Sequence, residues 1–346
     1  MPRRTTSLRR SILPRIGVPA VALALFVSLT GCGLLGGNDD KPTNNASSGG
    51  LEKPNLKVSV MTTTDLAPFW LAVKGGYFKD AGFTFDPAKD VVTSKSGSES
   101  VAKLAAKEVD IAYSSYTPFF VAKSKGVADI KFVSDAASAG PGATMVVTMP
   151  TSSVKSIKDM AGKRVAVTAR NTISDLLVMS TLKTNGVDWT TIHWVEIPFP
   201  STGDALAKGQ VDAAFLTEPF LAQAQKKQGA VPVFDTAVGP TANMPAAGFG
   251  ANAEFVKNNP KTLAAWQKVM QRATDEAKAD RSKVEQLLQD FAKIDADTAK
   301  LTTLLTFQSS LDATRIQRVP DLMLEFGVIK DKIDVSTMIA KSTSSG

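Results

Sequence analysis

Apolar runs alternate with helix-like stretches from residue 56 to about residue 220, and this alternation is the strongest pattern in the chain. The runs are short and rich in Val, Ile and Ala, which is typical of buried strands. We predict strands over 57–61, 109–112, 130–134, 145–148, 164–168, 194–197 and 211–216. We predict helices over 68–73, 99–107, 172–184 and 203–208. Strands that alternate with helices in this way indicate an α/β fold with parallel sheets covered by helices.

Two stretches about one hundred residues apart resemble each other. Residues 104–119 read LAAKEVDIAYSSYTPF, and residues 206–220 read LAKGQVDAAFLTEPF. Asp110 and Asp212 occupy matching positions, and we interpret both as structural residues at strand starts. Coincidence in an Ala-rich sequence is the alternative, but the order and spacing of the elements agree as well as the letters. The repeat therefore predicts two α/β lobes of one design.

The remaining residues, 245–346, show helical periodicity instead. Apolar residues recur at three- and four-residue intervals over 252–279 and 283–292, and the pattern continues over 301–311 and 319–326. Ser282 is a candidate N-cap for the second of these helices. Because no third copy of the repeat is visible, we expect these helices to pack on one lobe and return the chain to it. The predicted lobes are thus 56–146 plus 245–346, and 147–244.

The first 31 residues have the composition of a secretory signal peptide. A basic region ends at Arg15, and the apolar stretch 18–29 (VPAVALALFVSL) follows. A membrane anchor helix is the alternative, although the stretch is short for a span and interrupted by Pro and Ser. Residues 29–32 (LTGC) resemble the lipobox of bacterial lipoproteins, which implies cleavage before Cys32 and lipidation of its sulfur. Arg9 and Arg10 also fit a loose twin-arginine motif, so the Sec and twin-arginine export routes both stay open.

Cysteine content and charge support an exported protein that has no nucleic-acid partner. Cys32 is the single cysteine, so the mature domain has neither an internal disulfide nor a cysteine nucleophile. Five of the 40 basic residues and none of the 33 acidic residues lie in the leader, which leaves a net charge of only +2 elsewhere. This near balance removes the electrostatic argument for nucleic acid. Residues 32–55 are rich in Gly, Asn, Ser and Pro, and we predict a flexible tether there.

Polar side chains gather where the predicted strands end. Ligands bind beyond the carboxyl ends of strands in open parallel sheets, so two facing lobes would form a ligand cleft. The strand-end loops lie at 62–65, 93–97, 113–116, 168–172, 200–203 and 217–219. Their polarity is concentrated in hydroxyl groups, with aromatic residues beside them, and this combination suits reversible binding of a small molecule.

Each candidate residue also has a structural interpretation. Ser96 and Thr172 are potential helix caps, and Glu218 precedes Pro219 at a predicted helix start. Phe69 and Trp70 are alternatively core residues. Arg170 either binds an anionic ligand group bidentately or forms a salt bridge with Glu218 or Asp175.

Several motifs together resemble one family of bacterial substrate-binding proteins. They are Ala67-Pro68 followed by GGYFKDAG at 75–82, VDIA at 109–112, GKRVAV at 162–167, IPFP at 197–200, GQVDAA at 209–214, TEPF at 217–220 and NNP at 258–260. The family is the nitrate/sulfonate/taurine type of ABC transporter substrate-binding proteins, which also includes binders of thiamine pyrimidine precursors and riboflavin-like compounds. The resemblance covers roughly residues 56–290.

The resemblance implies a periplasmic-binding-protein-like fold, in which two α/β lobes are joined by a two-strand hinge with a ligand cleft between them. The chain would cross near 146–150 and again near 241–248. Carried over residue by residue, the implied ligand contacts are Thr63, Thr64, Asp65, Phe69, Trp70, Ser96, Gly97, Ser114, Tyr116, Arg170, Asn171, Thr172 and Glu218. This chain departs from the family pattern at 84–90, where the second strand is interrupted or shifted, and at 169–173, which lacks a Gly/Ser-rich run.

We therefore expect a lipid-anchored solute-binding protein on the extracytoplasmic face of the cell membrane. It would be a monomer without metal or cofactor, held to the membrane through lipid on Cys32, and it would deliver its ligand to an ABC permease and the ATPase of that permease. Arg170 and Lys95 favour a small organic anion such as a sulfonate, taurine or nitrate. The aromatic residues favour the alternative, an aromatic heterocycle such as a thiamine pyrimidine or riboflavin precursor.

Two rival functions use the same fold. A tethered sensor would capture its ligand in the same way and report to a membrane partner. An enzyme is the second rival, but the chain has one histidine, His193, in a strand-like run, and it has no P-loop, Gly-x-Ser-x-Gly or Gly-x-Gly-x-x-Gly motif. We expect no enzymatic activity.

Overall fold

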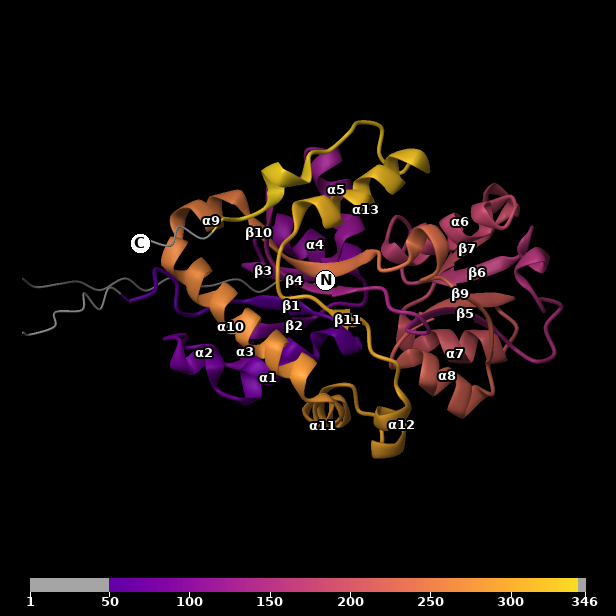
Figure 1. Cartoon of the computed structure of the whole chain (residues 1–346), viewed down its shortest axis with the longest axis horizontal. Helices are drawn as coiled ribbons and strands as arrows, with labels where there is room; N and C mark the ends of the chain where they lie inside the picture. The colour runs from indigo at the N-terminus through magenta and orange to yellow at the C-terminus, as the bar shows by residue number, and fades with distance from the viewer. Residues whose placement is uncertain (1–49, 342–346) are drawn as a thin grey trace, which may run out of the picture. The chain divides into compact units, whose positions relative to one another are not determined.

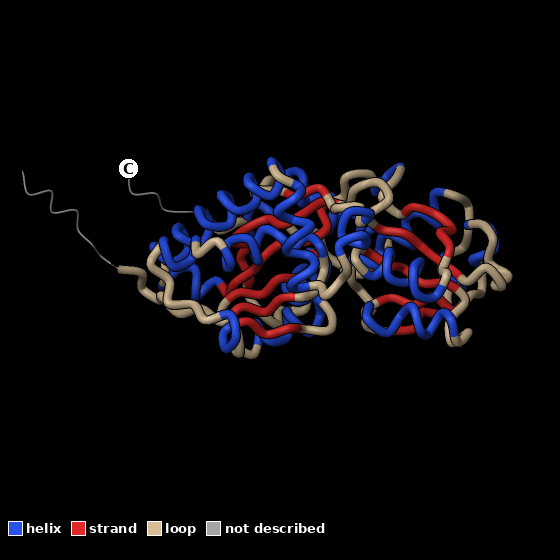
Figure 2. The backbone as a smooth tube through the Cα atoms, turned by 90° about the horizontal axis from the view of Figure 1, so that it is seen from below, coloured by secondary structure: helices blue, strands red, loops and turns tan. Residues whose placement is uncertain are grey.

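Two β-sheets organise residues 50–341, the part of the chain that the computed structural model describes. The six-stranded sheet has the order β11-β4-β10-β3-β1-β2, and the five-stranded sheet has the order β7-β6-β8-β5-β9. We call the first sheet with its helices lobe A and the second with its helices lobe B (Figure 1; Figure 2). The predicted signal peptide, Cys32 and most of the predicted tether lie outside the described residues.

The strands follow the predicted apolar runs closely. Lobe A contains β1 (Val58–Val60), β2 (Val91–Thr93), β3 (Ile111–Ser115), β4 (Ile130–Ser138), β10 (Pro245–Asn252) and β11 (Thr306–Phe307). Lobe B contains β5 (Thr144–Thr148), β6 (Arg164–Val167), β7 (His193–Glu196), β8 (Ala213–Thr217) and β9 (Val231–Asp235). The interrupted second strand is shifted: Asp86 caps the short helix α3 (Pro87–Asp90), and β2 begins only at Val91.

Helices cover both faces of each sheet. In lobe A, α4 (Gly97–Ala105), α5 (Tyr116–Ser124) and α13 (Ala313–Glu325) lie on one face, and α1 (Ala67–Lys74) and α10 (Pro260–Ala279) lie on the other (Figure 1). In lobe B, α6 (Ile173–Thr184) lies on one face, and α7 (Phe199–Ala207) and α8 (Phe220–Gln228) lie on the other. The remaining helices of lobe A are α2 (Tyr77–Asp80), α9 (Ala253–Asn258), α11 (Arg281–Phe291) and α12 (Ala296–Leu301). Across both lobes and the segments between them, 3₁₀ turns cover Thr64–Leu66, Ile157–Met160, Trp189–Thr191, Gly239–Thr241 and Val335–Met338. The predicted α/β class is confirmed.

The two lobes share one strand plan. In lobe A, β1 lies between its parallel partners β2 and β3, and β10 and then β4 continue the sheet beyond β3. In lobe B, β6 lies between its parallel partners β7 and β8, and β5 and then β9 continue beyond β8. The sheets are mixed rather than purely parallel, because β5 and β10 each enter from the other lobe and pair antiparallel.

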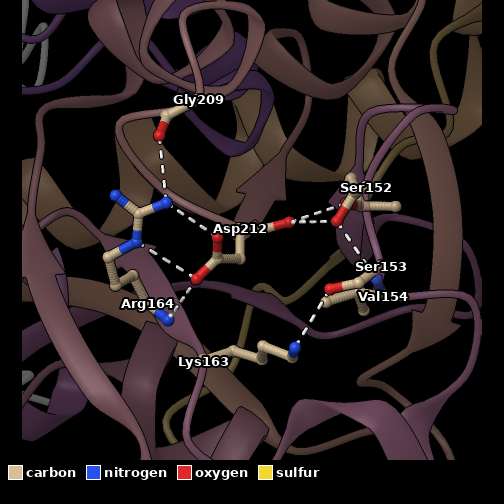
Figure 3. Close-up of polar contacts among 8 residues, drawn as sticks. Ser152, Ser153, Val154, Lys163, Arg164, Gly209 and Asp212 are labelled. Carbon is tan, nitrogen blue, oxygen red and sulfur yellow. Dashed lines mark hydrogen bonds and ion pairs between the residues drawn. The ribbon is translucent and has the colours of Figure 1, made fainter.

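The matching aspartates have matching structural roles. Asp110 accepts hydrogen bonds from the Lys57 backbone N–H at 2.9 Å and from Lys53 Nζ at 2.5 Å. Asp212 accepts from the Arg164 backbone N–H at 2.8 Å and from its guanidinium at 2.7 and 3.1 Å, as Figure 3 shows. The Arg164 contacts lower the pKa of Asp212. Asp110 thus ties the start of β3 to the start of β1, and Asp212 ties the start of β8 to the start of β6, which confirms the structural interpretation.

The chain passes between the lobes through residues 139–143 and 236–244. The first crossing lies earlier than the sequence predicts, because residues 144–148 already form β5 and pair with β8 and β9 of lobe B. The second crossing ends where β10 begins at Pro245, within the predicted range.

Three predictions for the C-terminal segment need correction. The helix predicted over 252–279 is two helices, because Pro260 cannot continue the first of them and begins α10. The helix predicted over 301–311 is instead a loop containing β11, whose two residues pair with β4. Asp280, not Ser282, caps α11, since its carboxylate accepts from the Ser282 backbone N–H at 3.0 Å.

Candidate functional site

A cavity lies between the lobes and is lined by both. The space open to the centres of water-sized molecules is about 60 Å³, which is room for a few waters or a very small solute. Lobe A contributes Met61, Thr63, Asp65, Gly97, Tyr113, Ser115, Ala246, Ala247 and Leu305. Lobe B contributes Thr144, Thr168, Thr172, Ile173, Ser174, Leu177, Phe199, Phe215 and Thr217.

The lobes touch each other directly around this cavity. The Thr64 backbone N–H of lobe A donates to the Glu218 carbonyl of lobe B at 3.3 Å. The Ile173 backbone N–H of lobe B donates to Ser115 Oγ of lobe A at 3.4 Å. These contacts narrow the cleft, so a ligand of more than a few atoms requires the lobes to move apart.

Three helices begin at the cavity wall. Gly97 is the first residue of α4, Ile173 of α6 and Phe199 of α7, and all three line the cavity. A helix N-terminus presents backbone N–H groups and the positive end of the helix dipole. Thr172 caps α6, because its Oγ1 accepts from the Ser174 backbone N–H at 3.3 Å. The wall therefore offers partial positive charge from the backbone.

The side chains of the wall are mainly hydroxyls. Eight lining residues carry one: Thr63, Tyr113, Ser115, Thr144, Thr168, Thr172, Ser174 and Thr217. Within residues 50–341, Asp65 is the one carboxylate on the wall, and none of the lining residues is Lys or Arg. A ligand anion would therefore be received by hydroxyl and backbone donors rather than by a basic side chain.

Asp65 forms a small polar chain with two neighbours. The Tyr113 hydroxyl donates to Asp65 Oδ2, and Thr63 Oγ1 lies 3.2 Å from that hydroxyl. Because the single tyrosine proton goes to Asp65, Thr63 is the donor to Tyr113. Burial raises the pKa of Asp65, and it also raises the pKa of Tyr113 well above its ordinary value, with help from the nearby Asp65 charge. Oδ1 of Asp65 is buried and has no partner among the described residues.

The cavity brings together four of the residues predicted to contact ligand, namely Thr63, Asp65, Gly97 and Thr172. Ser114 lies directly behind Gly97, where a Cβ on the glycine would collide with its Oγ. Thr64 is fully buried next to Asp65. Ser96 has the capping role, since its Oγ accepts from the Glu99 backbone N–H at 3.2 Å.

The predicted aromatic contacts lie away from the cavity. Phe69 is fully buried in the core of lobe A, with its ring centroid 6.0 Å from that of Phe249. Trp70 stacks on Phe291 at 5.8 Å. Tyr116 is also fully buried and donates to Asp135 at 2.8 Å.

Arg170 and Asn171 line a groove beside α4 and α5 rather than the cavity. Of the two interpretations of Arg170, the salt bridge is observed, because its Nε lies 3.2 Å from Asp175. Its guanidinium also lies 4.7 Å from the Trp194 ring centroid.

Glu218 is almost completely buried where the two lobes meet. Its carboxylate accepts from the backbone N–H groups of Ala222 at 3.1 Å and Thr303 at 3.3 Å. Burial raises the pKa of Glu218. The residue joins the start of α8 to the C-terminal segment of lobe A.

Sequence reasoning did not select several wall residues. Ser115 and Thr217 are the last residues of β3 and β8, Thr168 follows β6, and Tyr113 lies within β3. All four fall in segments that the sequence marks as strand ends, so their position was the available signal. Thr144, Ala246, Ala247 and Leu305 lie on or beside segments that cross or approach the hinge, and no local pattern identifies them.

The described residues contain no group of three or more His, Cys, Asp or Glu placed to hold a metal ion. In the same range, no helix has the length and apolarity needed to cross a membrane.

Comparisons with known proteins agree with this architecture. The model of the NMT1-like family matches residues 49–289, whereas no curated protein matches the chain. The alkanesulfonate-binding protein SsuA from Xanthomonas axonopodis pv. citri bound to MOPS has a TM-score of 0.71 at 16% identity, covering 83% of this chain and 98% of its own.

Two further solved structures are similar. The periplasmic aliphatic sulphonate binding protein SsuA from Escherichia coli has a TM-score of 0.66 at 18% identity, with coverage of 83% and 97%. The periplasmic nitrate-binding protein NrtA from Synechocystis PCC 6803 has a TM-score of 0.66 at 13% identity, with coverage of 83% and 85%. At these identities the likeness concerns the fold, and it confirms the two-lobed architecture that the sequence predicts.

Proposed function

Because the chain belongs to the NMT1-like family and has the fold of periplasmic binding proteins, we propose that it is the extracytoplasmic solute-binding component of an ABC importer. It captures a small solute between its lobes by hinge motion and delivers it to the permease and ATPase. The observation that carries this proposal is the cavity shared by both lobes, whose wall combines hydroxyl side chains with three helix N-termini.

The ligand is a small organic anion of the sulfonate, taurine or nitrate kind. Helix N-termini and hydroxyl groups donate hydrogen bonds to anionic oxygens without a basic side chain. Two of the similar structures are named as sulfonate binders and one as a nitrate binder, which supports the same class. The aromatic alternative is supported by Phe199 and Phe215 on the wall, but the three helix N-termini and the hydroxyl side chains favour the anion.

The proposal includes a lipid anchor. The sequence LTGC at 29–32 supports lipidation of Cys32, with residues 32–55 acting as the tether to the folded lobes. Loss of membrane association in Cys32→Ser, measured by fractionation of cells, tests the anchor separately from ligand binding. Growth on the ligand after deletion of the gene separates the importer from the sensor, because a sensor mutant retains uptake.

Ligand binding is tested on the chain from residue 49, which forms one compact unit. Its melting temperature is measured with sulfonates, taurine, nitrate, pyrimidines and flavins. A ligand at one hundred times its Kd stabilises the protein by about 2.7 kcal/mol. Stabilisation by the anions supports the proposal, stabilisation only by aromatic compounds transfers it to the heterocycle class, and an unchanged melting temperature with every compound overturns it.

A further inference from the structure

Helix α13 belongs to lobe A but reaches lobe B. One face of the helix packs in lobe A, where Val319 and Met323 are fully buried. Arg315 fixes the start of the helix, because its guanidinium donates to Ser138 Oγ at 2.6 Å and pairs with the buried Asp135 of β4. The helix is therefore a firm part of lobe A.

The same helix holds the second segment that crosses between the lobes. The Arg318 guanidinium donates to three carbonyl oxygens of this segment, at 3.1 Å for Pro240, 2.9 Å for Ala242 and 3.1 Å for Asn243. The turn Gly239–Thr241 in the same segment packs against α6 of lobe B. Arg318 thus lies at the pivot about which the lobes move.

Beyond this pivot, the end of α13 contacts lobe B directly. Glu325 Oε1 lies 2.7 Å from Lys183 Nζ, near the end of α6. The ring centroid of Phe326 lies 5.4 Å from that of Trp189 and 5.5 Å from Lys183 Nζ. The seven residues from Arg318 to Glu325 span about 10 Å of helix. A rotation of one lobe about the pivot therefore displaces the contacts of Glu325 and Phe326.

A second ion pair joins the lobes at the other face of the lobe B sheet, which α8 covers. Lys226 Nζ of α8 lies 2.9 Å from both carboxylate oxygens of Asp295 and 3.2 Å from Thr298 Oγ1, at the start of α12 in lobe A. The hydrogen bond from Lys226 lowers the pKa of Asp295. Ion pairs between the lobes thus stand on both faces of that sheet.

Both ion pairs are remote from the cavity and fit one arrangement of the lobes. None of the four charged residues is among the described residues that line the cavity. Each pair joins one residue of each lobe at a distance that movement of the lobes can only lengthen. An interaction present in one of two states shifts the equilibrium toward that state. Each pair therefore favours the narrow cleft over a wider one.

We infer that Lys183–Glu325 and Lys226–Asp295 are two latches that hold the lobes of the unliganded protein together, so that charges remote from the cavity set the fraction of open molecules. The consequence for uptake rests on the proposed function, because a solute enters and leaves through the gap between the lobes. The latches then limit how often that gap opens.

The arrangement of the lobes is measured without any solute. Cys32 is the single cysteine, so the chain from residue 49 carries spin labels only at introduced cysteines. Lys95→Cys and His193→Cys place one label beside β2 and one in β7, the edge strands on the side away from the crossings. Both positions are exposed and outside the cavity wall. Pulsed electron spin resonance gives the distribution of distances between the labels.

Charge reversal tests the latches. Glu325→Lys replaces attraction to Lys183 by repulsion, and we expect the ratio of long to short label distances to rise by about threefold or more. Adding Lys183→Glu exchanges the two charges and should reverse most of the change. Lys226→Glu should act in the same direction as Glu325→Lys. Glu254→Lys is the matched control, because Glu254 also has an ion pair at 2.7 Å, with Lys107, but inside lobe A.

The outcomes separate this inference from the proposed function. Unchanged distances in both Glu325→Lys and Lys226→Glu overturn the inference. An equal change in Glu254→Lys, or no recovery when the charges of Lys183 and Glu325 are exchanged, overturns it as well. Melting temperatures verify that each variant is folded. Because no solute is present, longer distances that recover on exchange support the latches even when no compound of the panel binds.

Discussion

A buried carboxylate follows β1 in lobe A and the equivalent strand β6 in lobe B, and the two carboxylates are hydrogen-bonded in different ways. After β6 in lobe B, Asp175 accepts from the backbone N–H groups of Asn171 and Thr172, both at 2.8 Å, and pairs with Arg170. After β1 in lobe A, Asp65 accepts from Tyr113 through one oxygen, and its other oxygen has no partner among the described residues. Burial raises the pKa of both carboxyls.

Asp175 and Asp65 differ in the hydrogen-bond donors that reach their carboxylate oxygens. Asp175 completes a capping box for α6 and so contributes to the local fold. Asp65 faces a cavity and is not fully satisfied by its own loop. Two lobes of one design thus place the same residue type in different surroundings: both oxygens of Asp175 have partners, whereas Oδ1 of Asp65 has none among the described residues, so the two carboxylates differ in their structural roles.

The largest effect should come from removing the lobe B carboxylate. Asp175→Ala leaves two backbone N–H groups and Arg170 without their acceptor, and we expect a loss of about 3 kcal/mol in the free energy of unfolding. Asp65→Ala, the matched variant, should cost about 1 kcal/mol or less, since only Tyr113 loses an acceptor. Urea denaturation measures both. Equal losses would contradict the division of roles.

A smaller loss of stability is expected from a substitution at Gly97, on the lobe A wall. Gly97→Ala places a Cβ against Ser114 Oγ and within 3.4 Å of the Ser115 backbone nitrogen. We expect destabilisation of about 2 kcal/mol together with weaker ligand binding. Ser98→Ala, one residue further along α4, is the control and should change neither quantity. The packing account fails if the two variants melt at the same temperature.

The pH dependence of stability offers a third comparison. The pKa of Asp65 is raised above its ordinary value of 3.8 in the folded protein, so the folded state binds this proton more tightly than the unfolded state. That contribution is fully present below pH 3.8 and is lost as the pH rises through the folded-state pKa.

Asp65→Asn removes this dependence. At neutral pH the unliganded variant should be as stable as the original protein or more stable by about 1 kcal/mol. Denaturation curves collected between pH 4 and pH 8 provide the measurement, with Asp90→Asn as the control. A variant whose stability has the same pH dependence as the original would argue against a raised pKa.

The smallest effect is expected for Arg170→Ala. Because Arg170 pairs with Asp175 and lies outside the cavity wall, the variant should change ligand affinity by less than about threefold. Calorimetric titration with the best ligand of the panel gives the answer. A loss of tenfold or more, about 1.4 kcal/mol, would restore Arg170 as an anion clamp.

Much of the fold could be predicted because local patterns determine it. The apolar runs became strands, and the Val-Asp repeat corresponds to equivalent strands tied by Asp110 and Asp212. The failures are local as well. Pro260 divides a periodic stretch into two helices. The apolar residues of 301–311 have helix-like spacing, but most of this segment is a loop whose β11 residues pair with β4.

The cavity was harder to predict, because it depends on which face each strand-end residue presents. Hydroxyl residues such as Thr63 and Thr172 could be identified from their position after a strand. Phe69 and Tyr116 lie near the same loops, yet they are completely buried in lobe A, since large aromatic rings gain most from the core. Thr144 and Ala246 reach the wall only because the chain crosses between the lobes there, which no local pattern reveals.

The position of β10 between β3 and β4 has a consequence for synthesis of the protein. Translation produces β3 and β4 early, but the strand that joins them follows only after all of lobe B, about one hundred residues later. Until then, the edges of β3 and β4 that will pair with β10 have no partner, and such edges favour association with other chains. Lobe B, by contrast, is one uninterrupted stretch from β5 to β9 and can close first. We therefore expect lobe A to be the part of the nascent chain more prone to association until residue 252 has been added.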